Sequence, residues 1–331
     1  MAGNSNLHMS HRNKADEFYT SFSLIENELR HYKEHFKDKI VFCNCDDPYE
    51  SNFFKYFVMN FNFLGLKKLI TTCYALPQSE KHSYKVEITE VNKTGDRSID
   101  ITDVEYLMKN PRNTITLLDG DGDFRSDECV KLLEEADIVV TNPPFSLFRD
   151  FISLLIAKEK DFLVVGNMNA VTCKNIFPLI RDNKVWLGYN SGHFWFKVPD
   201  TYEEKKTDFK IDENGQKWRR MGNICWFTNL SVEKRHEDII LFRNYIPDLY
   251  PKYDNYDAIN VDRTADIPCD YYGVMGVPIT FMQYYNPDQF EILGNSRYHD
   301  GQEFSDDINV LNGKTLYTRL LIKRRKLGVN Q

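Results

Sequence analysis

The feature that most constrains the fold is an alternation of short apolar runs with segments of helical periodicity between residues 39 and 166. The apolar runs have lengths typical of buried strands and lie at 39–43, 66–73, 137–141 and 161–166. The helical segments lie at 53–63, 127–136 and 147–158, with a further helix expected at 18–36 and further strands at 84–91 and 114–118. Strands that alternate with helices form βαβ units, so we predict an α/β fold with a mostly parallel sheet covered by helices on both faces.

The pattern changes after residue 184, where strands are expected at 185–187, 194–198 and 224–228. From about residue 236 the chain is rich in Tyr, Asp, Asn and Pro and shows few clear helices. A chain of 331 residues is long enough for one large domain and a smaller appendage. We therefore predict a main domain at 1–235 and a second region at 236–331.

Composition and charge exclude several classes of protein. The net charge of −7 argues against a protein that coats nucleic acid without specificity. Two basic clusters, Lys217–Arg220 and Lys323–Lys326, are candidate local contact faces, and a solvated edge is the simpler interpretation of each. The 7 cysteines are scattered without a CxxC pair, so we expect reduced thiols and no metal site. The chain lacks a membrane-length apolar run and an apolar signal stretch, so we expect a cytoplasmic protein without membrane contact.

Ligands of open α/β sheets bind beyond the carboxyl ends of the strands, so the turns there are candidate sites. The first turn, Cys43–Ser51, contains no GxGxxG motif and is acidic. Aspartates at a helix N-terminus would repel a pyrophosphate, whereas a cationic cofactor without phosphate, such as S-adenosylmethionine, fits better. The candidate cofactor residues are Asn44, Cys45, Asp46 and Asp47. The alternative is an ordinary helix start with Asp47 as its N-cap.

The next two strand ends are less specific. Thr72–Ala75 lacks an acidic residue for a ribose, although Tyr74 could pack on an adenine ring or in the core. Asp119, Gly120 and Asp121 begin an Asp/Gly loop that fails the calcium-loop register, because Phe124 and Val130 replace the required Gly and Glu. We expect an aspartate of this loop to contact an adenine amino group, with a plain turn as the alternative.

The fourth strand end carries the strongest signal, Asn142-Pro143-Pro144-Phe145. Consecutive prolines stiffen the loop, keep Asn142 out of helical conformation and remove two N–H donors. The Asn142 side-chain oxygen and the Pro143 carbonyl can therefore both accept from one NH₂ group, while Phe145 offers its ring to a planar ligand. This predicts a pocket for an amino group on an aromatic ring, such as N6 of adenine, whose nitrogen lone pair is exposed for attack on a methyl group.

Several segments together resemble the EcoRI-type adenine-specific DNA methyltransferases, and the resemblance runs along nearly the whole chain. The matching segments are Asp16–Thr20, Cys43–Pro48, Thr141–Phe145 and Gly273–Thr280. The resemblance implies a Rossmann-like class I methyltransferase fold of about seven strands. It implies methyl transfer from S-adenosylmethionine to N6 of adenine at a specific site in double-stranded DNA. A restriction endonuclease for the same site usually accompanies such an enzyme, orphan and phage forms are the alternative, and related enzymes can work as monomers.

The resemblance also implies roles for individual residues. Phe18, Tyr19 and Thr20 would lie near the methionine end of the cofactor, Asn44 to Asp47 would replace the glycine-rich loop, Asp119 to Asp121 would reach the adenosine, and Asn142 to Phe145 would hold the target base. The adenine must flip out of the duplex to reach such a pocket, and residues 236–331, helped by Trp218 to Arg220, would read the DNA sequence. The same chemistry on an RNA adenine or a protein glutamine amide, and a non-catalytic DNA-binding role, remain alternatives.

Overall fold

The structure is a computed structural model that describes residues 18–45, 51–74, 82–91, 107, 113–299, 302–303 and 308–326. The chain divides into two compact units. Unit 1 comprises residues 1–167 and 188–230, and unit 2 comprises residues 168–187 and 231–331. Residues 168–187, which the sequence suggested as part of the main domain, group with unit 2. No helix in the described part of the chain is long and apolar enough to cross a membrane.

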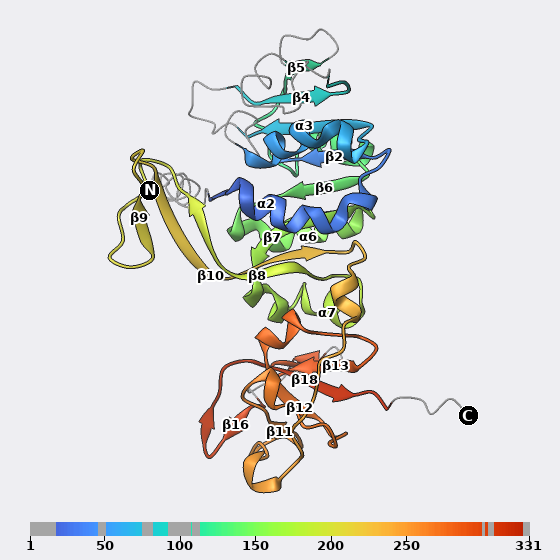
Figure 1. Ribbon diagram of the computed structural model, residues 1–331, viewed down its shortest axis with the longest axis vertical. Coiled ribbons are helices and arrows are strands. Elements are labelled where there is room, and N and C mark those ends of the chain that lie inside the picture. The colour runs from blue at the N-terminus through green and yellow to red at the C-terminus, as the bar shows by residue number, and fades with distance from the viewer. Residues whose placement is uncertain are drawn as a thin grey trace, which may run out of the picture. The chain divides into compact units, whose positions relative to one another are not determined.

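Unit 1 is built on a large mixed sheet, with strands in the order β1-β8-β10-β7-β6-β2-β3-β4-β5 and β9 paired to β10 (Figure 1). Its strands are β1 (Tyr19–Thr20), β2 (Ile40–Cys43), β3 (Lys68–Cys73), β4 (Tyr84–Ile88), β5 (Thr114–Leu117), β6 (Ile138–Thr141), β7 (Asp161–Asn167), β8 (Trp186–Lys197), β9 (Phe209–Ile211) and β10 (Lys217–Thr228). Strands β2 and β6 are buried along their whole length, as expected for central strands covered on both faces.

The helices of unit 1 are α2 (Phe22–Leu29), α3 (Asn52–Leu64), α5 (Asp127–Glu135) and α6 (Phe148–Ala157), with 3₁₀ helices η1 (Arg30–His35) and η2 (Phe145–Leu147). Helix α3 begins where the Ser51 hydroxyl accepts from the N–H groups of Phe53 and Phe54, and it ends at Gly65 in a left-handed conformation. The N-cap is therefore Ser51, and the alternative that Asp47 caps this helix is wrong. Figure 1 shows α2 and α3 on the near face of the sheet.

The α/β class and the predicted alternation of strands and helices are confirmed. The large sheet is mixed and has ten strands in the described residues. Parallel pairing joins β7, β6, β2 and β3, whereas β10 pairs antiparallel with β7, β4 with β3 and β5 with β4. The strands predicted at 185–187 and 194–198 are one continuous strand, β8. From β2 the chain crosses to β3, and from β6 it crosses in the opposite direction to β7. The carboxyl ends of β2 and β6 thus form the topological switch point where ligands bind in such sheets.

Unit 2 contains a smaller sheet in the order β11-β12-β18-β13-β14-β15 and a separate hairpin of β16 and β17. Its strands are β11 (Ile259–Asn260), β12 (Met275–Pro278), β13 (Phe290–Asn295), β14 (Tyr298–His299), β15 (Gln302–Glu303), β16 (Val310–Leu311), β17 (Lys314–Thr315) and β18 (Arg319–Arg324). Its helices are η3 (Met168–Thr172), α7 (Phe177–Arg181), η4 (Glu233–His236), η5 (Pro247–Leu249), η6 (Thr264–Asp266) and η7 (Ile279–Gln283). The 273–280 segment contains β12 and the start of η7, and Gly276 of β12 is required because a Cβ there would overlap the Tyr253 hydroxyl.

Candidate active site

The turns after β2 and β6 meet at the switch point of the unit 1 sheet. The two strands pair in parallel, with Val41 opposite Ile138. The Thr141 hydroxyl, at the end of β6, donates to the carbonyl of Asn44, at the end of β2. This bond brings the Asn142 loop and the Asn44 turn together.

Asn142 is anchored by a residue distant in the sequence. Its Nδ2 donates to the backbone carbonyl of Phe18. Its Oδ1 is buried and has no hydrogen-bond partner among the described residues. Rotating the amide by 180° would place Oδ1 against the Phe18 carbonyl oxygen, so the hydrogen bond fixes the orientation. The site therefore presents an oriented acceptor that no described residue pairs, and a buried polar atom in that state is accounted for by a bound ligand or water.

Aromatic rings cluster around Phe18, whose carbonyl holds Asn142. The rings of Phe145 and Phe18 are stacked with centroids 5.8 Å apart and an interplanar angle of 25°. Phe196 lies edge-on to both rings, at 6.0 Å from Phe18 and 6.3 Å from Phe145. The Tyr202 ring also lies edge-on to Phe18, with centroids 6.2 Å apart. The sequence predicted Phe145 and Phe18 at the site but missed Phe196 and Tyr202, because an aromatic residue in a strand or loop carries no sign of its function.

The segment that holds Asn142 is itself positioned by two elements. Strand β1 pairs antiparallel with β8, with Tyr19 opposite Lys197 and Thr20 opposite Phe196. Asn52, the first residue of α3, donates from Nδ2 to the Thr20 carbonyl at 2.8 Å. These contacts bring the predicted residues Phe18, Tyr19 and Thr20 to the same edge of the sheet as Asn142.

Further buried polar atoms without partners in the described residues lie at neighbouring strand ends. They are the Asn44 Oδ1 after β2, the Thr72 Oγ1 near the end of β3 and the Thr20 Oγ1 of β1. Burying such atoms unpaired costs free energy, on the order of 1–3 kcal/mol each. Asn44 is joined to the Asn142 loop through the Thr141 hydroxyl, and Thr20 follows closely on the Phe18 carbonyl that holds Asn142, so these two residues are candidates to bind a polar ligand beside the Asn142 acceptor.

The predicted adenosine-contact residues also come together. Gly122 has a φ of +81°, and a Cβ there would overlap the carbonyl of Cys73, so the loop packs directly on the end of β3. The Ser83 hydroxyl donates to the Gly120 carbonyl and fixes the same loop. Burial raises the pKa of Tyr74, and the nearby charges of Asp121 and Asp123 raise it further, so Tyr74 faces the acidic loop. Asp119 is tied through its N–H to the Glu128 carboxylate at 3.0 Å.

The acidic turn after β2 is only partly described. Cys45 is half-buried and adopts a left-handed conformation, with a φ of +65°. A non-glycine residue in that region is uncommon and marks a sharp change of chain direction. The predicted cofactor residues Asp46 and Asp47 lie outside the described residues.

The basic cluster at Lys217–Arg220 makes internal contacts. Lys217 Nζ donates to the carbonyls of Asp200 and Tyr202 at 2.9 and 3.1 Å. Arg219 Nη1 donates to the Thr207 carbonyl, and Arg220 lies 3.5 Å from the Asp208 carboxylate. The cations therefore brace the loop that carries Tyr202, and their charges are not cancelled where the acceptor is a neutral carbonyl. A DNA contact by Trp218 to Arg220 stays a prediction.

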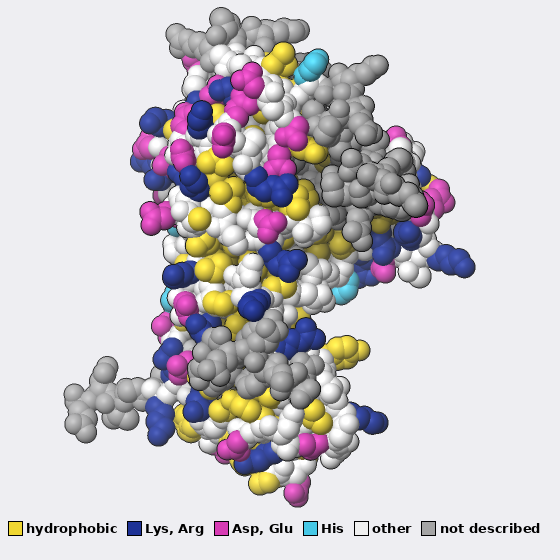
Figure 2. Space-filling view, turned by 180° about the vertical axis from the view of Figure 1, so that it is seen from behind, with side chains coloured by type: hydrophobic (Ala, Val, Ile, Leu, Met, Phe, Trp, Pro, Cys, Tyr) yellow, Lys and Arg dark blue, Asp and Glu magenta, His cyan; other side chains and the backbone are white. Residues whose placement is uncertain are grey.

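The second basic cluster is similar. Arg324 donates to the Cys269 carbonyl and lies over the Tyr272 ring, and Arg325 Nε donates to the Pro287 carbonyl at 2.8 Å. On the face shown in Figure 2, Lys and Arg side chains are interspersed with Asp and Glu, and no continuous basic surface is visible among the described residues. Any nucleic-acid contact on this face would therefore depend on individual side chains.

Comparison with known proteins identifies similar chains. The family described as adenine-specific methyltransferase EcoRI matches residues 6–325. The chain is 47% identical over 336 residues to the type II methyltransferase M.EcoRI of Escherichia coli, covering 98% of each chain. It is 38% identical to M.MgeORF184P of Mycoplasma genitalium, covering 96% of this chain and 100% of the relative. It is 36% identical to M.MpnI of Mycoplasma pneumoniae, with 95% and 96% covered. No solved structure matches.

Proposed function

Because the chain belongs to the EcoRI-type family of adenine-specific methyltransferases, we propose that it methylates N6 of adenine at a specific site in double-stranded DNA. S-adenosylmethionine is the proposed methyl donor, and the enzyme would act within a restriction–modification system beside an endonuclease for the same site. The observation that carries the proposal is the buried, open Oδ1 of Asn142, held in place by the Phe18 carbonyl.

In the proposed reaction the adenine amino group lies between two acceptors, the Asn142 Oδ1 and the Pro143 carbonyl. The two N–H bonds of N6 point at these oxygens, which draws the nitrogen lone pair out of conjugation with the ring. Phe145 stacks on the flipped base and offsets part of the unstacking cost, a few kcal/mol. When bound, S-adenosylmethionine supplies a sulfonium methyl group, so a nitrogen–carbon bond forms as the sulfur–carbon bond breaks, and N6 then releases a proton to solvent.

The residues at the carboxyl edge fit a cationic cofactor. Asn44, Thr20 and Thr72 offer the buried polar atoms without partners described above, which suit the polar groups of the amino acid and ribose. Tyr74 and the loop of Asp121 both lie at the end of β3, where Gly122 packs on the Cys73 carbonyl, and would flank the adenosine. No phosphate-binding loop is needed for this ligand, which agrees with the missing GxGxxG motif. The strands β8-β10-β7-β6-β2-β3-β4 would correspond to the seven strands of a class I methyltransferase.

Reading of the DNA sequence is assigned by this proposal to the C-terminal region, residues 236–331. Its contacts with phosphates would release counterions, so binding should weaken steeply as salt is raised. A monomer suffices for an enzyme that modifies one strand at a time.

The test is methyl transfer from labelled S-adenosylmethionine to unmethylated genomic DNA, followed by sequencing that detects N6-methyladenine. Label in one short recurring motif is expected and would also supply the recognition site. Asn142→Ala should abolish transfer, because it removes the acceptor for N6. It also removes the Nδ2 bond to the Phe18 carbonyl, worth about 0.5–1.5 kcal/mol, so the fold should be retained with only a small loss of thermal stability. Cofactor binding without label in DNA would contradict the proposal and direct the search to RNA or protein glutamine as substrate.

A further inference from the structure

Unit 2 exposes one aromatic side chain to an extent that its fold does not explain. Tyr317 is 93% exposed, the highest value among the large hydrophobic side chains in the described residues. It lies in the short connection between β17 and β18. An aromatic side chain gains free energy when it leaves water, so full exposure is unfavourable unless a partner covers the ring.

The backbone around Tyr317 is nonetheless held firmly. The buried Asn309 donates from Nδ2 to the carbonyl of Leu316 at 2.7 Å and to that of Tyr317 at 2.8 Å. The Leu316 N–H donates in return to the Asn309 carbonyl at 3.1 Å. Two residues on, Arg319 exchanges hydrogen bonds with Ser296, through its N–H to Oγ and its carbonyl to N–H. The ring is therefore presented on an ordered backbone, which lowers the entropy cost of binding.

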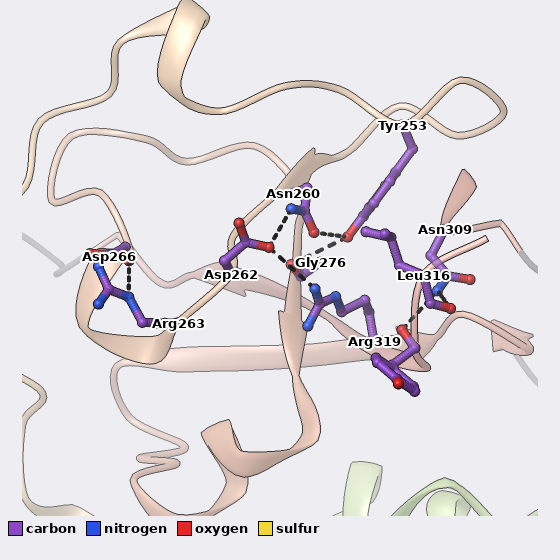
Figure 3. A network of polar contacts seen from close by, with 10 residues as sticks. Tyr253, Asn260, Asp262, Arg263, Asp266, Gly276, Asn309, Leu316 and Arg319 are labelled. Atoms are coloured by element: carbon purple, nitrogen blue, oxygen red, sulfur yellow. Dashed lines mark hydrogen bonds and ion pairs between the residues drawn. The ribbon is translucent and has the colours of Figure 1, made fainter. Parts of the chain in front are cut away.

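A carboxylate is fixed next to this segment through Arg319 (Figure 3). Arg319 Nη2 donates to the Asp262 Oδ1 at 3.3 Å, and Asn260 Nδ2 donates to the same oxygen at 2.8 Å. Asn260 is itself fixed, because its Oδ1 accepts from the Tyr253 hydroxyl at 3.0 Å. The Arg319 side chain is only 12% exposed, whereas that of Asp262 is 75% exposed.

The network fixes the Asp262 carboxylate and leaves its Oδ2 as an acceptor in a defined position. Both donors reach Oδ1, and no described residue donates to Oδ2. The neighbouring Arg319 compensates the negative charge, so an anionic partner can approach. A fixed carboxylate oxygen accepts well from the exocyclic amino group of a base, as aspartate does from N4 of cytosine.

We propose that Tyr317 and Asp262 form a base-reading site for duplex DNA. The Tyr317 ring stacks on a base at an opened step, and the Asp262 Oδ2 accepts from the amino group of a cytosine or adenine. This inference rests on the proposed function, because it concerns how that enzyme selects its DNA site. Duplex DNA is favoured over a protein partner because the proposed function already makes DNA the substrate of this chain.

The stacking role of Tyr317 is tested by the affinity for a duplex that carries the recognition site. This affinity is measured by fluorescence anisotropy at fixed salt with S-adenosylhomocysteine present. Tyr317→Ala should weaken binding by about 5- to 150-fold, the range for loss of a stacked base. Tyr317→Phe should restore binding, because the ring is retained. Tyr284→Ala is the matched control, since Tyr284 is also in unit 2 and is 54% exposed. Equal affinities of Tyr317→Ala and Tyr284→Ala would overturn the assignment.

The base-reading role of Asp262 is tested by the preference of methylation for one DNA sequence over another. Asp262→Asn keeps the size of the side chain but can place an amide N–H donor where Oδ2 was, so preference should shift at one position of the site from a base with an amino group to one with a carbonyl. Methylation of a library with every single-base change, read by sequencing, measures this shift. Asp257→Asn is the control, because Asp257 is 91% exposed in unit 2 and pairs only with Lys252 in the described residues. An unchanged preference in Asp262→Asn, with normal wild-type methylation, would refute the inference and leave the proposed function intact. A wild type that never methylates DNA would refute both.

Discussion

Asn142→Asp tests the orientation of the proposed catalytic amide. In the wild type, Nδ2 donates to the Phe18 carbonyl and Oδ1 is left open. Aspartate has nearly the same shape, but at neutral pH it offers only acceptors. One carboxylate oxygen would then face the Phe18 carbonyl oxygen, so the anchoring hydrogen bond is lost and a repulsive contact replaces it.

The size of the effect follows from that single contact. Leaving a buried acceptor without its donor costs about 1–3 kcal/mol. If the whole cost falls on the geometry needed for transfer, the rate drops by about 5- to 150-fold at neutral pH. The same contact disfavours the ionised form, as does partial burial, so the pKa of the new carboxyl group should lie above that of a free aspartate.

A raised pKa gives the variant a characteristic pH dependence. Below this pKa the carboxyl group carries a proton and can donate O–H to the Phe18 carbonyl, while its other oxygen still accepts from the substrate. Activity relative to wild type should therefore rise as pH falls and be lost as pH rises through the pKa. The wild-type amide does not titrate, so its own profile provides the normalisation.

The assay is single-turnover methyl transfer into a duplex that contains the recognition site, from pH 5 to 8.5, for wild type, Asn142→Asp and Asn142→Ala. The alanine variant has neither group and should show no recovery at low pH. A deficit in Asn142→Asp that is constant with pH, or full activity at pH 8, would show that the Phe18 contact does not orient the catalytic acceptor.

Three further changes follow from other contacts. Glu28 accepts from the Tyr32 hydroxyl and from groups on β8, and burial raises its pKa. The unfolding free energy of the wild type should therefore fall as the pH rises above the pKa of Glu28 in the unfolded chain and through its raised pKa in the folded chain. Glu28→Gln should flatten this dependence in urea titrations between pH 4.5 and 8. Gly122→Ala should cost about 1–2 kcal/mol of backbone strain and push the loop off the Cys73 carbonyl, weakening S-adenosylmethionine binding in calorimetry more than DNA binding. Asn52→Ala removes the side-chain bond to the Thr20 carbonyl, worth about 0.5–1.5 kcal/mol, and should slow methyl transfer by about 2- to 13-fold with DNA affinity unchanged; an unchanged rate would show that β1 docks without it.

The parts of the fold that the sequence predicts well are those determined by local burial. Apolar runs such as 138–141 and 161–167 form strands where expected because they are covered on both faces. The prediction of two strands around 185–198 was wrong because the intervening stretch, Gly188–Gly192, is polar and glycine-rich. In the structure the Glu28 carboxylate accepts from the N–H groups of Tyr189 and Asn190, at 2.6 and 2.7 Å, so the strand continues through it. That contact spans 161 residues of chain and leaves no periodic signal.

In the candidate site, too, local features could be predicted from the sequence and long-range contacts could not. The Asn-Pro-Pro-Phe loop could be proposed as the site from the sequence because its residue types and spacing are typical of one kind of chemistry, and its role stays a prediction. The orientation of its amide could not be predicted, because the anchor is a backbone carbonyl 124 residues away, and any residue at position 18 supplies a carbonyl. Phe196 is likewise an ordinary buried strand residue until β1 is seen to pair with β8.

The orientation of the Asn142 Oδ1 thus depends on contacts outside the Asn-Pro-Pro-Phe loop. The prolines stiffen the backbone of the loop, but the direction of the Asn142 amide depends on β1, which pairs with β8 through only two residues. A strand this short contributes few hydrogen bonds, so local opening there should be easier than opening of the central sheet. When β1 is displaced, Asn142 loses its donor contact and its amide can rotate, which removes the fixed acceptor. If Asn142 is the acceptor that we propose, catalytic competence depends on docking of the segment that begins at Phe18. A change at β1 should then lower the rate of transfer without altering any residue proposed to contact the adenine.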